Sequence, residues 1–410
     1  MSEKSITFAA AKVNRVMSTI QDIDNLYIPG FEEYIRQGEP DKKAKASLWQ
    51  TAIGLQAVDG LKTSEYLYET ARRNIEGEIN LEEANKLIHT YYQKRAAHDE
   101  PIDDDEAEAD RASANIARIL ASQTLAFSTN GLIALHRRIF EGVFPHAGQI
   151  RKFDITKKEW ILREDTVNYL NYDDIRDAID YDIAEEKAFS YANISNDAMI
   201  AHISRFTYNL WQIHPFQEGN TRTTAVFLIL YLRSIGFAVD NDLFASHAWY
   251  FRNALVRAVY RNARLGVDYS PQYIERFFRN LLLGEQWELK SRYLVINPPA
   301  EYAEQPRRDT PTSTPTSTPT STPTSTPTSM PETIERVVRA LGEKQLTSKE
   351  LMAAVGLKNR ENFVEYSLNP AIENGFVRLL YPESPRHPRQ KYLLTVKGIV
   401  ALNQLPGVKK

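Results

Sequence analysis

Apolar residues recur every three or four positions through most of this chain, which is the spacing of one face of an α-helix. Two such patterns fall within residues 48–95, and the segment 76–80 between them predicts a helix end followed by a new N-cap at Asn80. Farther along, the same spacing predicts helices at 113–126, 131–140, 174–190, 197–213, 220–235 and 271–283. The middle of the chain is therefore expected to be a helical domain.

One segment of this region departs from the helical spacing. Residues 149–162 (QIRKFDITKKEWIL) place β-branched and aromatic residues around a charged turn, which is typical of a strand pair. We therefore expect a mainly α fold with one small β-hairpin in the central domain.

Two stretches of biased composition divide the chain. Residues 310–329 repeat the unit Pro-Thr-Ser-Thr, which favours polyproline II structure and predicts a semi-rigid linker, although a glycosylated, mucin-like stalk has the same composition. In residues 99–110, eight of twelve are acidic, which predicts a solvated loop whose last acids favour the N-terminus of the next helix. The parts expected on either side are a helical N-terminal region at 1–98, a central domain at 111–300 and a C-terminal domain at 331–410.

The C-terminal domain is expected to combine three helices with a hairpin. Helices are predicted at 331–341, at 347–355 and from Asn359, and strands at 376–381 and 391–395. This arrangement resembles a winged helix. The basic residues around the hairpin tip are Arg386, His387, Arg389 and Lys391. A cationic wing suits the backbone of DNA, while the same fold also serves protein contacts.

The composition narrows the possible chemistry. The chain has 42% hydrophobic and 25% charged residues and no cysteine, which excludes disulfides, thiol nucleophiles and Cys-based metal sites. No run approaches the roughly 20 apolar residues of a membrane span, and Lys12 and Arg15 interrupt the first stretch, so we expect a cytoplasmic protein. Residues 331–410 carry 13 Lys and Arg against 8 Asp and Glu, so +5 of charge lies there and −8 in the remainder of a total of −3.

The strongest chemical pattern is a loop between two apolar helices, IHPFQEGNTR at residues 213–222. Gly219 lets the backbone approach a ligand, and the N–H groups at the start of the next helix favour an anion such as phosphate. Glu218 is a candidate oxygen ligand for a Mg²⁺ that accompanies the phosphate, and Arg222 can bind phosphate oxygens. His214 has the side chain whose ordinary pKa suits proton abstraction near neutral pH.

Each of these residues alone is more often structural, as a turn histidine, a helix cap or a Gly-Asn turn. Together they specify six positions, His-x-Phe-x-Glu-Gly-Asn-x-Arg, a string expected by chance on the order of once in 10⁵ chains of this size. The string resembles the signature of the Fic-domain family, His-Pro-Phe-x-Asp/Glu-Gly-Asn-Gly-Arg-x-x-Arg. Residues 140–158 resemble the flap that precedes it, and the resemblance covers roughly residues 111–283.

This resemblance implies an enzyme that transfers the AMP moiety of ATP to a hydroxyl group of a target protein. His214 would deprotonate the attacking Ser, Thr or Tyr hydroxyl, and Glu218 would hold Mg²⁺ on the ATP phosphates. A segment of the target would pair with the edge of the flap near residues 155–158. The implied nucleotide contacts are Gly219, Asn220, Thr221, Arg222, Thr156, Lys157 and Tyr250. Tyr250 is equally well explained as a core tyrosine.

Two positions depart from the family signature, Thr221 at its second glycine and Ala225 at its last arginine. The Cβ of Thr221 is expected to narrow the space where the backbone meets a phosphate, and Ala225 removes a cation that contacts the γ-phosphate. Two alternatives to protein AMPylation therefore stay open. One is a Fic-fold enzyme that uses another phosphate-containing donor, and the other is a DNA-binding regulator whose Fic domain senses a nucleotide.

The N-terminal region resembles antitoxin-like segments, which silence Fic proteins through a glutamate that pairs with the last arginine of the signature. Asp59, in LQAVDGL at 55–61, and Glu76 are the inhibitory candidates, and both can equally be plain helix-end residues. Because Ala225 replaces the arginine that such an acid would bind, we expect weak or altered autoinhibition.

Overall fold

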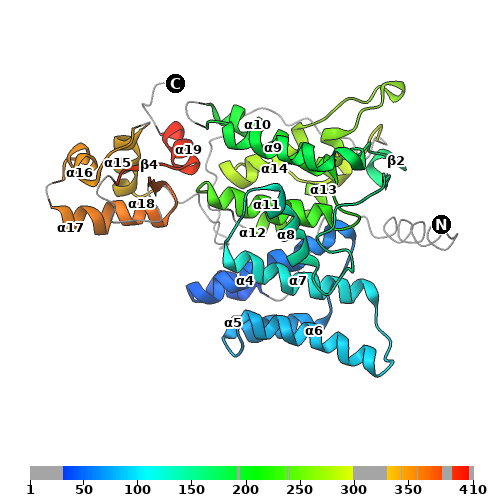
Figure 1. Cartoon of the computed structure of the whole chain (residues 1–410). Helices are drawn as coiled ribbons and strands as arrows, with labels where there is room; N and C mark the ends of the chain where they lie inside the picture. The colour runs from blue at the N-terminus through cyan, green and yellow to red at the C-terminus, as the bar shows by residue number, and fades with distance from the viewer. Residues whose placement is uncertain are drawn as a thin grey trace, which may run out of the picture. The chain divides into compact units, whose positions relative to one another are not determined.

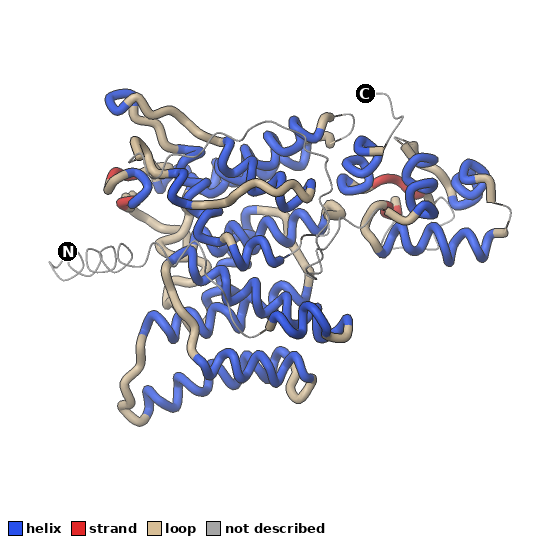
Figure 2. The backbone as a smooth tube through the Cα atoms, turned by 180° about the vertical axis from the view of Figure 1, so that it is seen from behind, coloured by secondary structure: helices blue, strands red, loops and turns tan. Residues whose placement is uncertain are grey.

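The computed structural model describes residues 31–191, 194–237, 239, 241–298, 330–342, 344–357, 359–380 and 390–405. The chain divides into two compact units, Met1–Leu294 and Val295–Lys410. Helices dominate and the strands are few and short (Figure 2), which confirms the expected mainly α fold. The Pro-Thr-Ser repeat at 310–329 lies outside the described residues. Within these ranges no helix is both long and apolar enough to cross a membrane.

The first unit is built from α-helices joined by loops and short 3₁₀ turns. Its helices are α3 (Glu32–Gln37), α4 (Pro40–Gly54), α5 (Glu65–Glu76), α6 (Leu81–Ala97), α7 (Asp104–Ser122), α8 (Thr129–Phe140), α9 (Ile175–Ala188), α10 (Asn196–Ile213), α11 (Asn220–Ser234), α12 (Asn241–Ser246), α13 (Ala248–Val259) and α14 (Gln272–Leu283). Its 3₁₀ turns are η1 (Leu55–Asp59), η2 (Trp160–Leu162), η3 (Tyr172–Asp174), η4 (Ala263–Leu265) and η5 (Ser291–Leu294). The helices predicted at 131–140, 174–190, 197–213, 220–235 and 271–283 are all present to within two residues at each end.

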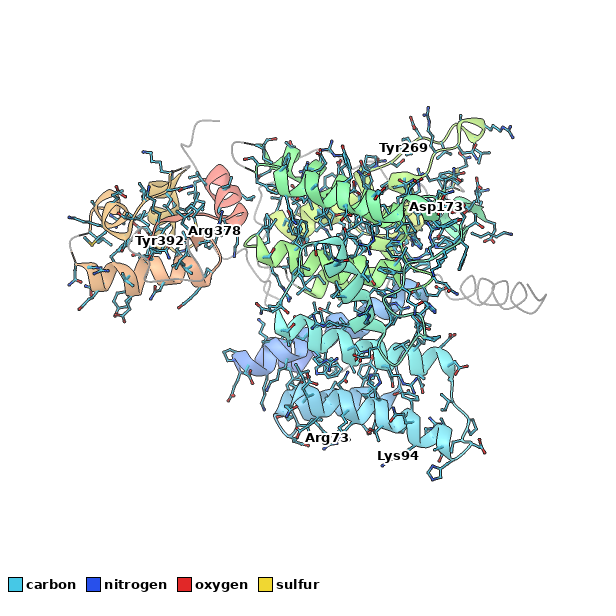
Figure 3. All side chains as sticks on the ribbon, in the orientation of Figure 1. Arg73, Lys94, Asp173, Tyr269, Arg378 and Tyr392 are labelled. Carbon is cyan, nitrogen blue, oxygen red and sulfur yellow. The ribbon has the colours of Figure 1, made fainter. Side chains whose placement is uncertain are left out.

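Helices α5 and α6 form a layer beside α4 and α7 (Figure 1). The predicted break between them is confirmed, because Gly77 ends α5 with a φ of 86° and Asn80 caps α6 through a reciprocal pair of hydrogen bonds with Glu83. Arg73 and Lys94 project into solvent from this layer (Figure 3). The layer therefore has one solvated side and one side packed on the rest of the unit.

Helix α7 begins nine residues earlier than its apolar spacing predicts. The expected loop at 99–110 is wrong for its second half, which forms the first turns of this helix. The side chain of Asp103 caps the helix by accepting hydrogen bonds from the N–H groups of Asp105 and Glu106. The acids of the first turn are stabilised by the helix dipole, which explains why an acidic run is helical here.

Asp110 fastens α7 to the layer of α5 and α6. Its buried carboxylate accepts hydrogen bonds from the backbone N–H of Ser64, at 2.9 Å, and from the hydroxyl of Ser64, the N-cap residue of α5. It also accepts a hydrogen bond from the hydroxyl of Tyr92 on α6, at 2.7 Å. Burial raises the pKa of Asp110 to about 6, although the hydrogen bonds from Ser64 and Tyr92 act against this rise.

We expect the first unit to lose stability as the pH rises from about 4 to about 6. The raised pKa means that the folded chain binds the Asp110 proton more tightly than the unfolded chain does. A stabilisation on the order of 2 to 3 kcal/mol is therefore present at low pH and is lost as Asp110 ionises. Urea unfolding followed by tryptophan fluorescence reports on this unit, because all five tryptophans lie in it.

The Asp110→Asn variant should make the decline between these pH values shallower, and part of the decline should remain because burial also raises the pKa of Asp182 to about 6. The exposed Asp173 (Figure 3) provides a matched control, because Asp173→Asn should keep the decline of the wild type. An equal decline in the wild type and in Asp110→Asn would contradict the role of Asp110.

Helices α10 and α11 form the centre of the first unit. Thirteen of the fifteen residues of α11 are buried, as expected for a helix that is surrounded by packing partners. Helix α10 packs against α9, α13 and α14, and α11 packs against α8 and η1. The loop that joins α10 to α11 is therefore held between two fixed helix ends.

The predicted hairpin is present but lies later in the chain. Strands β1 (Lys158–Glu159) and β2 (Asp165–Thr166) pair antiparallel, whereas residues 149–157 are irregular. The cause is the buried Arg151, whose guanidinium donates hydrogen bonds to four backbone carbonyl groups. These belong to Phe153, Leu170, Ile213 and His214. The bonds tie the segment before β1 to the end of α10, so it does not pair with another strand.

The second unit is a small helical domain with one hairpin. Its elements are α15 (Glu332–Leu341), α16 (Ser348–Val355), α17 (Arg360–Phe363), a π-helical turn η7 (Val364–Leu368), α18 (Asn369–Glu373), β3 (Val377–Leu379), β4 (Tyr392–Leu394) and α19 (Val396–Gln404). Arg378 and Tyr392 come from the two paired strands (Figure 3). The pairing confirms the predicted hairpin, while helix α19 was not predicted from the sequence.

The hydrophobic core of the second unit is formed by Ile334, Val337, Val338, Leu341, Leu351, Val355, Phe363, Leu368, Ala371, Val377 and Leu394.

The basic tip of this hairpin was the basis of the DNA-binding hypothesis. Arg386, His387 and Arg389 lie outside the described residues, and Lys391 directly precedes β4. A winged-helix contact with DNA therefore stays a prediction.

Candidate active site

The loop between α10 and α11 is shaped by two backbone positions in the left-handed region. His214 ends α10 with a φ of 49°, and Gly219 precedes α11 with a φ of 74°. A Cβ at position 219 would lie 2.2 Å from the ring of Phe140, so both conformation and space require glycine there. The N–H groups of residues 220–222 begin the helix and have no partner within it. The loop therefore ends at the positive pole of a helix.

His214 is buried, and its surroundings keep the imidazole neutral. Burial lowers the pKa of His214 well below its usual value, and the nearby cations Lys157, Arg252 and Arg151 act in the same direction. Its Nδ1 lies 3.2 Å from the carbonyl oxygen of Trp211. Because a carbonyl can only accept, Nδ1 carries the proton and Nε2 keeps a lone pair. His214 is therefore in a state that accepts a proton at Nε2.

Two aromatic side chains fix the plane of this imidazole. Tyr169 stacks on it with ring centroids 4.0 Å apart, and the indole of Trp211 meets it edge-on at 5.2 Å and 89°. The sequence interpretation named neither residue. Trp211 lies three positions before His214, which is a helical spacing that could have indicated the contact. Tyr169 comes from the segment before α9 and gives no comparable local signal.

Glu218 and Lys157, both predicted from the sequence, are brought together. Lys157 Nζ lies 3.1 Å from Glu218 Oε2, and half of the Glu218 side chain is exposed. Thr156, the neighbour of Lys157, is exposed. The described ranges contain no cluster of three or more His, Asp or Glu side chains that could hold a metal ion. A half-exposed carboxylate beside a helix N-terminus nevertheless fits Mg²⁺ that is shared with phosphate oxygens.

Asn220 and His136 hold the loop from inside. The Asn220 amide accepts a hydrogen bond from the N–H of Phe216 at 2.9 Å and donates one to its carbonyl oxygen at 2.7 Å. His136, on α8, accepts from the N–H of Gly148 at Nδ1, so Nε2 donates to the carbonyl oxygen of Glu218 at 3.1 Å. The amide of Asn220 therefore shapes the loop, and its contact with a nucleotide stays a prediction.

Arg222 is almost fully buried, and acidic and amide groups from far earlier in the chain surround its guanidinium. Its Nε forms an ion pair with Asp59 Oδ2 at 2.8 Å. The terminal nitrogens donate to Gln56 Oε1 at 2.9 Å and to Glu108 Oε1 at 2.7 Å. The ring of Phe140 covers one face, 4.8 Å from the guanidinium carbon. The predicted phosphate-binding arginine is therefore occupied by groups from η1 and α7.

The two inhibitory candidates lie in different places. Asp59 reaches the loop, so the expectation that it lacks an arginine partner because of Ala225 is wrong. It pairs with the first arginine of the signature, Arg222, in place of the last. Glu76 lies at the end of α5 and pairs with Lys42 on the surface. Of the two acids, only Asp59 is joined to the candidate site.

Helix α13 contributes residues beside the loop. Tyr250 is buried and its hydroxyl donates to the carbonyl oxygen of Tyr273 at 3.1 Å, which favours the core explanation. Arg252 forms a bidentate ion pair with Glu159 of β1, in which its two terminal nitrogens donate to the carboxylate oxygens at 2.6 and 3.0 Å. This arginine was not identified from the sequence, because its partner lies 93 positions earlier. It ties the hairpin to α13.

Two regions of the chain match known families. Residues 126–232 match the Fic/DOC family, and residues 332–395 match the C-terminal domain of proteins described as filamentation induced by cAMP protein Fic-like. A protein of Sinorhizobium fredii, named a probable protein adenylyltransferase, is 32% identical over 110 residues. That match covers 27% of this chain, which spans about half (54%) of the length of that relative.

Two solved structures show a weaker likeness. A Fic family protein from Desulfovibrio desulfuricans G20 has 16% sequence identity and a TM-score of 0.40, over 96% of this chain and 97% of that chain. The N-terminal Fic domain of a Bartonella effector protein, from Bartonella sp. AR 15-3, has 18% identity and a TM-score of 0.34, over 42% of this chain and 81% of that chain. The sequence matches carry the family assignment: residues 126–232 of this chain form a Fic/DOC family domain, and a Fic-like C-terminal domain follows at residues 332–395.

Proposed function

We propose that this chain is a Fic-type transferase that moves AMP from ATP to a Ser, Thr or Tyr hydroxyl of a target protein. The observation that carries the proposal is the state of His214. Its Nδ1 proton is held by the carbonyl of Trp211, so Nε2 can accept a proton. His214 lies in the same short loop as the half-exposed carboxylate of Glu218 and the N-terminus of α11, and a helix N-terminus favours anions.

Each part of the loop has a separate role in the proposed transfer. The target hydroxyl loses its proton to Nε2 of His214 as its oxygen attacks the α-phosphorus of ATP. The bond between this phosphorus and the oxygen that bridges it to the β-phosphate breaks, and pyrophosphate leaves. The N–H groups of residues 220–222 stabilise the negative charge on the phosphate oxygens. Bound Mg²⁺, with Glu218 as its protein ligand, would supply charge neutralisation on those phosphates.

In this structure the guanidinium of Arg222 is already paired with carboxylates. A phosphate that binds Arg222 must displace Asp59, Glu108 or both, because they occupy its guanidinium. Lys157 likewise occupies the carboxylate that would bind the metal ion. We therefore propose that Asp59 restrains the nucleotide site, through Arg222.

The proposed reaction is tested with the full chain and ATP labelled at its α-phosphate, in a cell lysate that contains Mg²⁺. We expect label to appear on protein. Label that arrives only from the γ-phosphate, or from a donor other than ATP, would replace AMP transfer with another phosphate-containing donor. A chain that binds nucleotide and transfers nothing would favour the regulator in which this domain senses a nucleotide.

We expect Glu218→Ala to weaken Mg²⁺-dependent nucleotide binding by roughly tenfold, because it removes the protein ligand proposed for the metal ion. The measurement is calorimetric titration with a non-hydrolysable ATP analogue, with and without Mg²⁺. Glu69→Ala, at an exposed carboxylate on α5, is the matched control and should keep the wild-type affinity. If Mg²⁺ raises the affinity of Glu218→Ala as much as that of the wild type, the metal assignment is wrong.

A further inference from the structure

We propose that Thr221 is a positioning residue for His214 and acts through Trp211. The indole Nε1 of Trp211 donates a hydrogen bond to Thr221 Oγ1 at 3.0 Å, between two buried side chains. The family signature has glycine at this position, so the bond depends on a departure from that signature. The inference rests on the proposed function, in which His214 is the base.

Trp211 contacts His214 with both its backbone and its side chain. Its carbonyl oxygen accepts hydrogen bonds from the His214 backbone N–H, at 3.1 Å, and from Nδ1, at 3.2 Å. Its indole meets the edge of the imidazole at 89°, while Tyr169 covers the imidazole face. The orientation of the indole therefore sets one wall of the space that the imidazole occupies.

Thr221 fixes that wall from the other side. It lies in the first turn of α11, so its hydroxyl links the start of α11 to the last turn of α10. Removal of the hydroxyl leaves a buried indole N–H without its acceptor, and the indole then gains freedom to rotate or shift. The imidazole would lose a fixed neighbour, and misplacement of a reacting group by about 1 Å slows a reaction by up to about 100-fold.

This role and the crowding expected from the sequence predict opposite results. If Thr221 only narrows the phosphate space, a glycine at position 221 should speed the reaction. If Thr221 positions His214, the same glycine should slow it. The isosteric Thr221→Val removes the acceptor and keeps the volume, and Thr221→Ser keeps the acceptor and removes a methyl group, so the pair separates hydrogen bonding from size.

The first experiment needs no enzymatic activity. The full chain is labelled with ¹⁵N in tryptophan and histidine, and the Trp211 indole and His214 imidazole signals are assigned by their loss in Trp211→Phe and His214→Ala. We expect Thr221→Val and Thr221→Gly to raise the exchange rate of the Trp211 indole N–H with solvent at least tenfold and to shift the His214 signals. Thr221→Ser should leave both unchanged. Thr224→Val, the same substitution later in α11, is the matched control.

The second experiment measures AMP transfer at saturating and limiting ATP. Thr221→Val and Thr221→Gly should lower kcat by about 10- to 100-fold with KM for ATP within a few-fold, and Thr221→Ser should stay within about threefold of the wild type. A faster Thr221→Gly, or a Thr221→Val with wild-type kcat, would overturn the positioning role while leaving the proposed function intact. If the wild type transfers nothing, the proposed function fails, and unshifted His214 signals in Thr221→Val then overturn the inference separately.

Discussion

Replacing His214 with alanine is expected to lower AMP transfer by about 10²- to 10⁴-fold, while ATP affinity stays within a few-fold of the wild type. The variant loses the group proposed to take the proton from the attacking hydroxyl. It keeps the N-terminus of α11 and the carboxylate of Glu218, which are proposed to bind the nucleotide. Single-turnover transfer from α-labelled ATP and titration with an ATP analogue measure the two effects separately.

The pH dependence provides a second check on the same residue. Because the pKa of His214 is lowered by burial, the base stays unprotonated well below the usual range of histidine. The pH dependence of kcat/KM reports the pKa of the base in the free enzyme. We therefore expect kcat/KM to stay constant down to a pH of about 6.5 and to decrease only at lower pH. His98→Ala, at an exposed histidine on the end of α6, should retain full transfer. Unreduced transfer by His214→Ala would remove this residue from the mechanism.

Releasing Arg222 from its carboxylates is expected to raise nucleotide affinity and turnover by roughly tenfold or more. The change is Asp59→Asn combined with Glu108→Gln, which removes two negative charges and keeps the side-chain shapes. A charge-assisted contact contributes about 1.5 to 3 kcal/mol, so a phosphate that no longer competes with two carboxylates gains at least one factor of ten. Titration with an ATP analogue and transfer at limiting ATP measure the gain.

Glu76→Gln is the matched control for this prediction, since Glu76 was the other inhibitory candidate and lies on the surface beside Lys42. It should leave affinity at the wild-type level. The double variant has a second outcome, because a buried arginine that loses its partners destabilises a fold. A lowered melting temperature with unchanged nucleotide affinity would mean that Asp59 and Glu108 only anchor η1 and α7.

The sequence predicted those parts of the site that depend on neighbouring residues. The loop from His214 to Arg222 follows from a helix end, a glycine and a new helix start, all within ten positions. The hydrogen bonds to Arg222 show the limit of this approach, since Gln56 lies 166 positions away and Glu108 lies 114 positions away. Both come from helices that pack near α11 only in the folded chain, and no local spacing indicates which acid will reach it.

The same limit explains the other differences. The hairpin is displaced because Arg151 is bound by carbonyl groups of α10, which β-propensity does not reflect. Helix α7 starts early because capping by Asp103 and the helix dipole favour a helix where apolar spacing is absent. The sequence predicted that Thr221 would narrow the space for a phosphate, because its hydrogen bond with Trp211 forms only when the ends of α10 and α11 meet in the folded chain.

The carbonyl groups around Arg151 also bear on how this domain could be re-engineered. Arg151 joins the end of α10 to the segment that leads into β1, so the approach to the hairpin and the proposed base His214 share one anchor. Sequence changes confined to residues 158–166 lie beyond that anchor. A library varied there, with Glu159 kept because it binds Arg252, would alter the hairpin that follows the proposed target edge and would leave the Arg151 anchor unchanged. Grafting a hairpin from a relative would require Arg151 and its carbonyl partners to be transferred as one module.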